Sequence, residues 1–393
     1  MEEMKTDSKD SLSQLDSLLA SSHQSWLFGA GISLDAGIPL MADLTDRIFQ
    51  LAKEKGDEND EKLLNSIKNE LSDDAHIEHI LSHLGDHRAI AARSKSQKCK
   101  FGEIECTLEK LDNFHQRILQ WIAETIRWGY KAKSHEDEEE IGSADSPIVR
   151  IDAHQNFIDA LLEQGQAGLA ERRGAVRLFT TNYDTLLEDA LALQGYPYWD
   201  GFSGGAVAYR SYRYGEDEPK GFRAHVIKLH GSIDWHLGCD GKTWRVREND
   251  TYPEKSQRVL IYPQSIKYLA TQRDPFAAQF DLFRRALAQR DENVLIICGY
   301  SFGDEHINEE IELSLAKPEN KTTVIAFSKE LNSTLQEWRK SSWSKRLYII
   351  SRDGLYVGNS PVCLTPKDNE KHDWWKFQEM TKILKSGTEA YTL

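Results

Sequence analysis

The chain has 393 residues, of which 39% are hydrophobic and 28% are charged, and its formal net charge is −14. This composition is that of a folded globular protein and excludes a disordered or fibrous chain. The acidic excess disfavours unaided binding to nucleic acid, which depends on Lys and Arg for counterion release. Because the length exceeds what one compact core usually takes, we expect one large α/β domain with a helical insertion, or two domains.

The start of the chain and its cysteines carry no pattern for targeting or for a metal site. Residues 1–10 are polar and acidic, unlike a signal peptide, and no window is apolar enough to span a membrane. The five cysteines are scattered without a Cys-x-x-Cys pair. This spacing favours reduced thiols over a disulfide framework or a zinc ribbon. We therefore expect a cytoplasmic protein without a membrane contact.

A glycine-rich turn follows the first predicted strand, the apolar run at residues 26–28. The turn contains these small residues: Gly29, Ala30, Gly31, Ser33 and Gly37. A strand that turns sharply into a helix offers backbone N–H groups to a phosphate, and glycine permits the unusual backbone angles and leaves room for the phosphate. The spacing does not match Gly-x-Gly-x-x-Gly, and the acidic residue expected about 20 positions later is absent. The turn alone therefore leaves phosphate binding open.

The next part of the chain, residues 41–150, is predicted to be mainly helical. Apolar residues recur with helical spacing at positions 77, 80, 81 and 84, and again at 111, 114, 118 and 122. The acidic, turn-rich stretch 134–147 is interpreted as a solvated linker. We interpret the whole block as a helical insertion into a nucleotide-binding domain, or as a lid.

Strands alternate with helices in the remainder of the chain. Strands are predicted at 176–179, 226–229, 259–262, 294–298, 324–327 and 347–350, with helices at 156–162, 186–191 and 275–287. Continuous apolar strands between helices are typical of a parallel sheet covered on both faces. Residues 195–225 lack a clear period and are expected to form loops with a hairpin. Trp374, Trp375 and Phe377 are interpreted as a core or subunit contact.

Four predicted strands each end in a cluster of small and polar residues. The clusters occupy residues 29–33, 180–184, 230–234 and 299–304. Because ligands bind at the carboxyl ends of parallel strands, we expect all four clusters to face one crevice. Each cluster also has a simpler explanation. Asn182 and Asp184 could cap the following helix. His230 could be an ordinary loop histidine, and Ser301 and Asp304 could form a turn and a helix cap.

Taken in order, the clusters resemble the motifs of the sirtuin-like NAD-binding fold: Gly-Ala-Gly-Ile-Ser with Gly-Ile-Pro, then Thr-x-Asn-Tyr-Asp, Leu-His-Gly and Gly-Tyr-Ser-Phe-x-Asp. The resemblance covers residues 20–330 and implies a Rossmann-like, doubly wound parallel sheet. Residues 331–393 would be a strand and helix extension and a candidate oligomer contact. The resemblance implies that NAD+ is bound by Gly29, Ala30, Gly31, Ser33, Gly37, Thr181, Gly299 and Ser301. It also implies that Asn182 and Asp184 contact the nicotinamide ribose, and that His230 is the catalytic base.

Two departures separate the chain from protein-deacylating sirtuins. Leu40-Met41-Ala42 stands where those proteins have Asp-Phe-Arg. Only Cys239 lies between His230 and Cys298, so their four-cysteine zinc site cannot form, and no metal site is expected. The pattern is closer to bacterial sirtuin-like antiphage effectors, which hydrolyse NAD+.

The chain length and the helical insert resemble the stand-alone sirtuin-like subunit encoded beside a HerA-type translocase ATPase. This resemblance implies a large homo-oligomer capped by the ATPase, with NAD+ depletion on infection.

The sequence therefore predicts an NAD+ glycohydrolase. Nicotinamide is a cationic pyridinium in NAD+, so it leaves as a neutral base without prior protonation, through an oxocarbenium-like transition state. Asn182 would hold a ribose hydroxyl and a water, Asp184 would stabilise the cation, and His230 would accept a proton near neutral pH. Two alternatives remain: an NAD-dependent deacylase or ADP-ribosyltransferase, and a non-catalytic sensor of NAD or ADP-ribose.

Overall fold

The molecule is built on a nine-stranded sheet, whose strand order is β18-β17-β16-β15-β14-β1-β6-β10-β7. The computed structural model describes residues 2–57, 59–134, 138–163, 174–239, 241–247, 257–260, 275–288, 292–364 and 372–388. The strands are β1 (Gln24–Phe28), β6 (Val176–Thr180), β7 (Tyr198–Trp199), β10 (Ala224–Lys228), β14 (Asn293–Cys298), β15 (Thr322–Phe327), β16 (Leu347–Ser351), β17 (Gly354–Val357) and β18 (Ser360–Leu364). None of the helices in these ranges is long and apolar enough to cross a membrane.

The chain winds outward from β1 in both directions, which confirms the predicted doubly wound α/β sheet. From β1 it passes to β6 and β10 on one side, and later to β14, β15 and β16 on the other. All strands from β16 to β7 are parallel, whereas β17 and β18 are antiparallel. The strand order thus reverses between β1 and β14, the place where such sheets bind ligands.

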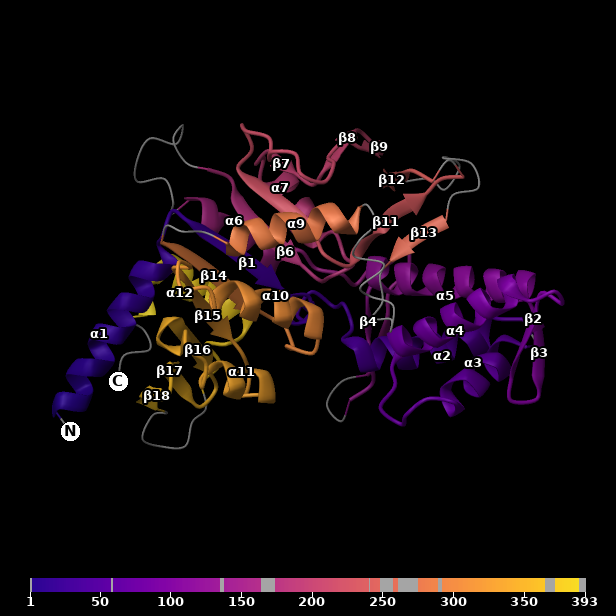
Figure 1. Ribbon diagram of the computed structural model, residues 1–393, viewed down its shortest axis with the longest axis horizontal. Coiled ribbons are helices and arrows are strands. Elements are labelled where there is room, and N and C mark those ends of the chain that lie inside the picture. The colour runs from indigo at the N-terminus through magenta and orange to yellow at the C-terminus, as the bar shows by residue number, and fades with distance from the viewer. Residues whose placement is uncertain are drawn as a thin grey trace.

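Helices cover both faces of this sheet (Figure 1). Trp26 and Phe28 point to one face of β1 and Leu27 to the other, as the two-residue period of a strand requires. The first face is covered by α1 (Glu2–Leu19), α6 (Asp152–Glu163), α7 (Leu186–Leu193) and α12 (Phe377–Ser386). The second face is covered by α9 (Phe276–Leu287), α10 (Glu305–Leu315) and α11 (Ser333–Trp338). Trp374 and Phe377 lie in the first core, so these two aromatic residues pack within the chain.

The helical block after Pro39 has an apolar core of its own, on the right in Figure 1. It contains α2 (Met41–Lys55), α3 (Asp60–Asn69), α4 (Ile77–Arg93), the hairpin β2 (Lys98–Phe101) and β3 (Ile104–Thr107), and α5 (Leu108–Trp128). The long helix α5 is capped by the Thr107 hydroxyl, which accepts from the Lys110 N–H, and it ends at Gly129 with φ of +90°. Within the predicted linker 134–147, β5 (Glu140–Ile141) pairs with β4 (Tyr130–Lys131), which directly follows α5, and residues 135–137 lie outside the described ranges.

A second, antiparallel sheet has the strand order β13-β11-β12-β9-β8. Its strands are β8 (Phe202–Gly204), β9 (Val207–Arg210), β11 (Gly231–Leu237), β12 (Thr243–Val246) and β13 (Gln257–Leu260). Strands β8 and β9 form the hairpin expected within residues 195–225. The sequence analysis did not predict β11, because its buried positions mix polar with apolar residues. The predicted strand 259–262 is described only as far as Leu260.

Glu218 contacts side chains on both β6 and β10, the neighbouring strands that lead into two of the four clusters. Its carboxylate accepts hydrogen bonds from Arg177 Nε on β6, at 2.9 and 3.0 Å, and lies 2.7 Å from His225 Nδ1 on β10. Burial alone would raise the pKa of Glu218, but the hydrogen bonds from His225 and Arg177 lower it to about 2. The carboxylate is therefore ionised in the folded protein well below the pH at which it takes up a proton in the unfolded chain.

The depressed pKa of Glu218 makes a pH-dependent contribution to the free energy of unfolding. The contribution is fully present above the unfolded pKa near 4.5 and is lost as the pH falls toward 2. We expect Glu218→Gln to unfold at lower urea concentration than wild type at neutral pH. Between pH 4.5 and pH 2, the free energy of unfolding of Glu218→Gln should fall less than that of wild type. Urea unfolding at a series of pH values measures this. Asp217→Asn, at the neighbouring exposed position, is the control and should follow wild type.

Candidate functional site

The turns after β1 and β14 touch backbone to backbone at the point where the strand order reverses. The Gly31 N–H donates to the Gly299 carbonyl at 2.9 Å, and the Gly29 N–H donates to the Cys298 carbonyl at 3.2 Å. A Cβ on Gly29 would lie 2.6 Å from the Gly299 oxygen, and one on Gly31 would lie 2.8 Å from the Gly299 Cα. Gly299 itself has φ of +67°. The glycines are therefore required by the packing of the two turns, whatever binds there.

This packing limits which backbone donors the turn can offer to a ligand. The N–H groups of Gly29 and Gly31 already have carbonyl acceptors, and the Ser33 N–H donates to the Ala30 carbonyl at 3.1 Å. Ala30 is exposed, and its own N–H has no backbone acceptor in the described part of the chain. The Ala30 amide is thus the donor of this turn best suited to meet an anion.

A hydrogen-bonded chain joins the turn after β1 to the loop after β6. The Asn182 amide donates to Ser33 Oγ at 3.1 Å, and Ser33 Oγ donates to Asp184 Oδ2 at 2.8 Å. Asp184 Oδ1 accepts from the N–H of Leu186, the first residue of α7, at 3.0 Å, whereas the N-cap position itself is occupied by Thr185. Asn182 is 7% exposed, and its Oδ1 has no partner among the described residues. A buried acceptor without a donor is costly, which favours a ligand hydroxyl or water there.

His230, directly after β10, is held by Asp304 from the loop after β14. The distance between His230 Nε2 and Asp304 Oδ2 is 2.9 Å, and the two side chains are 10% and 9% exposed. Asp304 Oδ1 accepts from the His306 N–H and so caps α10, as the sequence allowed. The carboxylate favours the imidazole with its proton on Nε2. In this tautomer Nδ1 is the ring nitrogen that can accept a proton.

A cavity of about 580 Å³ lies over these loops. Its lining includes all but one of the predicted site residues: Gly29, Ala30, Gly31, Ser33, Thr181, Asn182, Asp184, His230, Gly299 and Ser301. The size suits a substantial organic ligand. The structure thus brings the four clusters to one crevice, at the carboxyl ends of β1, β6, β10 and β14.

Gly37 is the predicted site residue that does not line this cavity. Its φ is +84°, and a Cβ there would lie 3.1 Å from the Ile148 oxygen. Its carbonyl accepts from the Tyr130 N–H at 2.9 Å. Gly37 therefore serves the joint between the first turn and the end of the helical block, which explains the glycine without a ligand.

Residues 176–348 match the profile of a SIR2-like domain. The match covers less than half of the chain and includes the loops that carry Asn182, Asp184, His230 and Asp304. No curated protein sequence matches the chain.

Among solved structures, a Sir2 homologue in complex with NAD is similar, at 13% identity and a TM-score of 0.38 over 82% of this chain and 85% of that one. A mutant Sir2 homologue in complex with ADP-ribose is similar at 12% identity and a TM-score of 0.37, over 82% and 87%. Similarities this remote say nothing about the activity of this chain.

Within residues 176–348, the ammonium group of Lys228 contacts the loop after β6. This lysine is 2% exposed, and its ammonium group donates to the carbonyls of Asn182, at 3.2 Å, and of Asp184. Its nearest carboxylate is Glu188, at 3.5 Å. Burial raises the pKa of Glu188 to about 7, although Lys228 and Arg247 act to lower it. Sequence reasoning missed Lys228, although a lysine inside the apolar run at 226–229 was a visible signal of a buried polar contact.

Residues before 176 and after 348 also line the cavity. Its lining includes Leu40, Met41, Leu44, His76, Glu78 and Ile126 from the helical block, and Trp375, Lys376 and Phe377 near α12. The Tyr183 hydroxyl, next to Asn182, donates to Glu78 on α4 at 2.8 Å. The helical block is therefore hydrogen-bonded to the loop that carries the candidate site residues.

Charged side chains of both signs line the cavity. Lys329 and Lys376 are exposed, and Lys376 is paired with Asp373 at 2.9 Å. The carboxylates in the lining are those of Asp35, Glu78, Asp184 and Asp304. Burial, followed by the nearby His79, lowers the pKa of His76 to about 4, so this imidazole is neutral at pH 7. These lysines were not predicted as site residues, because Lys329 follows β15 and Lys376 directly precedes α12, both far along the chain from the four clusters' first members.

Replacing Gly31 tests the requirement for close contact between the two turns. In Gly31→Ala the new methyl group would meet the backbone of Gly299 at 2.8 Å, and neither turn has a flexible side chain that could yield. We expect a loss of about 1–3 kcal/mol in the free energy of unfolding, measured with urea. Gly205→Ala is the matched control, because nothing lies within 4 Å of its Cβ position. Equal stability of the two variants would contradict the packing argument.

Proposed function

We propose that the protein is an NAD+ glycohydrolase that releases nicotinamide and ADP-ribose. The observation that carries the proposal is the unpartnered, buried Asn182 Oδ1, in a cavity that also presents His230 with Nε2 held by Asp304. An acceptor for a ribose hydroxyl and an oriented base are the two groups that hydrolysis of a glycosidic bond at a ribose requires. The match of residues 176–348 to a SIR2-like domain supports NAD+ as the ligand.

In this proposal NAD+ lies across the switch point of the sheet. The Ala30 amide and the turn from Gly29 to Ser33 contact the diphosphate, with Lys329 and Lys376 near its charges. Gly299 and Ser301 lie against the adenosine half, and Thr181 and Asn182 against the nicotinamide ribose. We assign no NAD+ contact to Gly37, which lies outside the cavity lining.

The chemical step breaks the bond between the ribose C1′ and the pyridinium nitrogen. The electron pair of this bond goes to the nitrogen, so the positive charge leaves nicotinamide and appears on the ribose as an oxocarbenium ion. A water oxygen then bonds to C1′, and its proton passes to His230 Nδ1. Asp184, a carboxylate with no ion-pair partner in the described residues, offsets the charge on the ribose.

The wider role that we propose follows the resemblance noted in the sequence. The enzyme would deplete NAD+ in the cytoplasm as a bacterial antiphage defence, as a homo-oligomer regulated by a HerA-type ATPase. The experiment that tests the activity incubates purified full-length protein with NAD+, alone and with the ATPase. Equimolar nicotinamide and ADP-ribose would support hydrolysis. Transfer of ADP-ribose to protein, or tight NAD+ binding without turnover under both conditions, would favour the alternatives.

Two substitutions test the proposed catalytic groups directly. We expect His230→Ala and Asn182→Ala each to reduce nicotinamide release by about 10²–10⁴-fold, the range that a positioned base typically contributes. The folded structure should persist in both, as measured by circular dichroism. His23→Ala, at an exposed histidine, is the control for His230→Ala and should keep wild-type activity. Nicotinamide release at the wild-type rate by both variants would overturn the assignment.

Asp304→Asn tests whether the carboxylate positions His230. An asparagine still caps α10, so the melting temperature should change little. Because the amide can also donate to Nε2 and so favour the wrong tautomer, we expect kcat to fall by about 10²-fold or more. KM for NAD+ should stay near the wild-type value, since Asp304 acts through His230. Glu305→Gln, at the neighbouring exposed position, is the control. A purely structural role would lower stability and leave kcat unchanged.

A further inference from the structure

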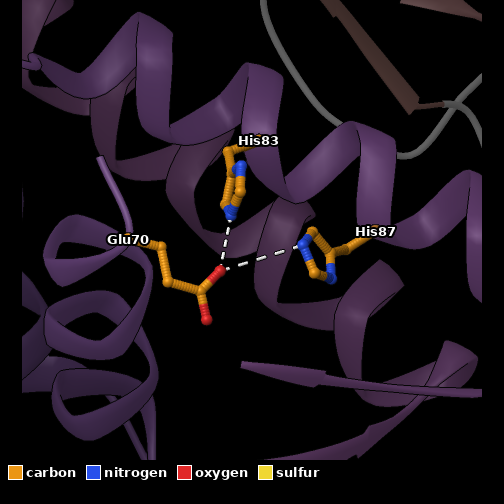
Figure 2. Close-up of side chains that lie close together, drawn as sticks. All are labelled: Glu70, His83 and His87. Atoms are coloured by element: carbon orange, nitrogen blue, oxygen red, sulfur yellow. Dashed lines mark hydrogen bonds and ion pairs between the residues drawn. The ribbon is translucent and has the colours of Figure 1, made fainter. Parts of the chain in front are cut away.

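A second cluster of polar side chains lies in the helical block, apart from the residues that line the cavity. His83 and His87 are four residues apart on α4, and both point toward the carboxylate of Glu70, the residue that caps the end of α3 (Figure 2). The distance from Glu70 Oε2 to His83 Nε2 is 2.7 Å, and that to His87 Nε2 is 3.9 Å. One oxygen and two ring nitrogens therefore converge on a single point.

The spacing of these three atoms fits a tetrahedral metal ion. In such a site, bonds of about 2.0–2.1 Å to nitrogen and oxygen place neighbouring ligand atoms about 3.3 Å apart. The two distances to Glu70 Oε2 lie on either side of this value, and all three ligand atoms lie within 4.8 Å of one another. Each of the two distances to Glu70 Oε2 differs from this value by about 0.6 Å, a difference that rotation of the side chains can remove.

Neighbouring groups hold the Glu70 carboxylate and the His87 ring in this arrangement. The Gly102 N–H, in the turn between β2 and β3, donates to Glu70 Oε1 at 2.8 Å and leaves Oε2 for the histidines. The His87 ring lies against Phe101, with ring centroids 4.2 Å apart and an interplanar angle of 30°. Outer contacts of this kind orient the ligands in natural metal sites.

The three candidate ligands can be reached from solvent. The side chains of Glu70, His83 and His87 are 31%, 25% and 20% exposed, so solvent reaches the point where they converge.

We propose that Glu70, His83 and His87 bind a Zn²⁺ ion, with water as the fourth ligand. Two imidazoles and one carboxylate are ligands that this borderline-soft ion accepts in tetrahedral geometry. The ion joins the end of α3 to the middle of α4 and, through the Gly102 amide, to the hairpin. The same helix α4 carries Glu78, which hydrogen-bonds to Tyr183 beside the cavity. Zinc thus stiffens the wall of the cavity that the helical block supplies.

The zinc proposal is independent of the proposed reaction and is tested by binding. Full-length protein is treated with a chelator, dialysed and titrated with Zn²⁺, and bound metal is measured by atomic absorption. We expect one zinc per wild-type chain. Affinity should fall by more than about 100-fold in Glu70→Gln and in His87→Gln, beyond the 10–100-fold typical of outer contacts. The control His23→Gln removes an exposed histidine and should bind as wild type.

A spectroscopic and a stability measurement keep the test decisive if a variant is poorly folded. Co²⁺ bound to the wild-type protein should give the strong visible absorption of tetrahedral coordination, and Zn²⁺ should displace it. Zn²⁺ should also raise the melting temperature of wild type and of His23→Gln. Stoichiometric zinc binding that survives in His87→Gln, or no zinc binding by wild type, would overturn the proposal. In the second case the cluster is only the ion pair of Glu70 with His83.

Discussion

The close backbone contact between the turn after β1 and Gly299 is the constraint on which the site depends. These turns meet at the reversal of strand order, and the distances leave no space for a Cβ at Gly29 or Gly31. The contact fixes the ends of β1 and β14 relative to each other. It thereby sets where Ser33 meets Asp184 and where Asp304 meets His230. The candidate catalytic groups are thus held by the geometry of the sheet rather than by flexible loops.

Much of this arrangement could be predicted from the sequence, because local patterns determine it. The apolar runs gave the parallel strands, and the four polar clusters at their ends had to share one edge of the sheet. Gly37 was predicted as a ligand contact but does not line the cavity, and its close approach to Ile148, more than 100 residues later, has no local pattern in the sequence. The partnership of His230 with Asp304 also joins two distant loops, and no pattern along the chain reports that pairing.

Other features were missed although the sequence contained a signal for them. The cysteine spacing bears only on a four-cysteine site, whereas His83 and His87 have the four-residue spacing that puts both side chains on one helix face. Their third partner, Glu70, comes from another helix, so spacing alone could not have identified it. Strand β11 was missed for another reason. Its buried Asp234 and His236 interrupt the apolar pattern by which strands are recognised.

Segments that are far apart along the chain, including residues 29–44, 181–184 and 375–377, line one cavity. Their separation affects when the site can form during synthesis. Trp375, Lys376 and Phe377 line the cavity together with Gly29 and its neighbours. Asp16 on α1 also accepts hydrogen bonds from Thr388, so the first helix is bonded to a segment translated much later. During synthesis on the ribosome, the cavity therefore stays open on one side until residues 375–377 have emerged and packed. A nascent chain therefore lacks one wall of the pocket until these late residues have been made.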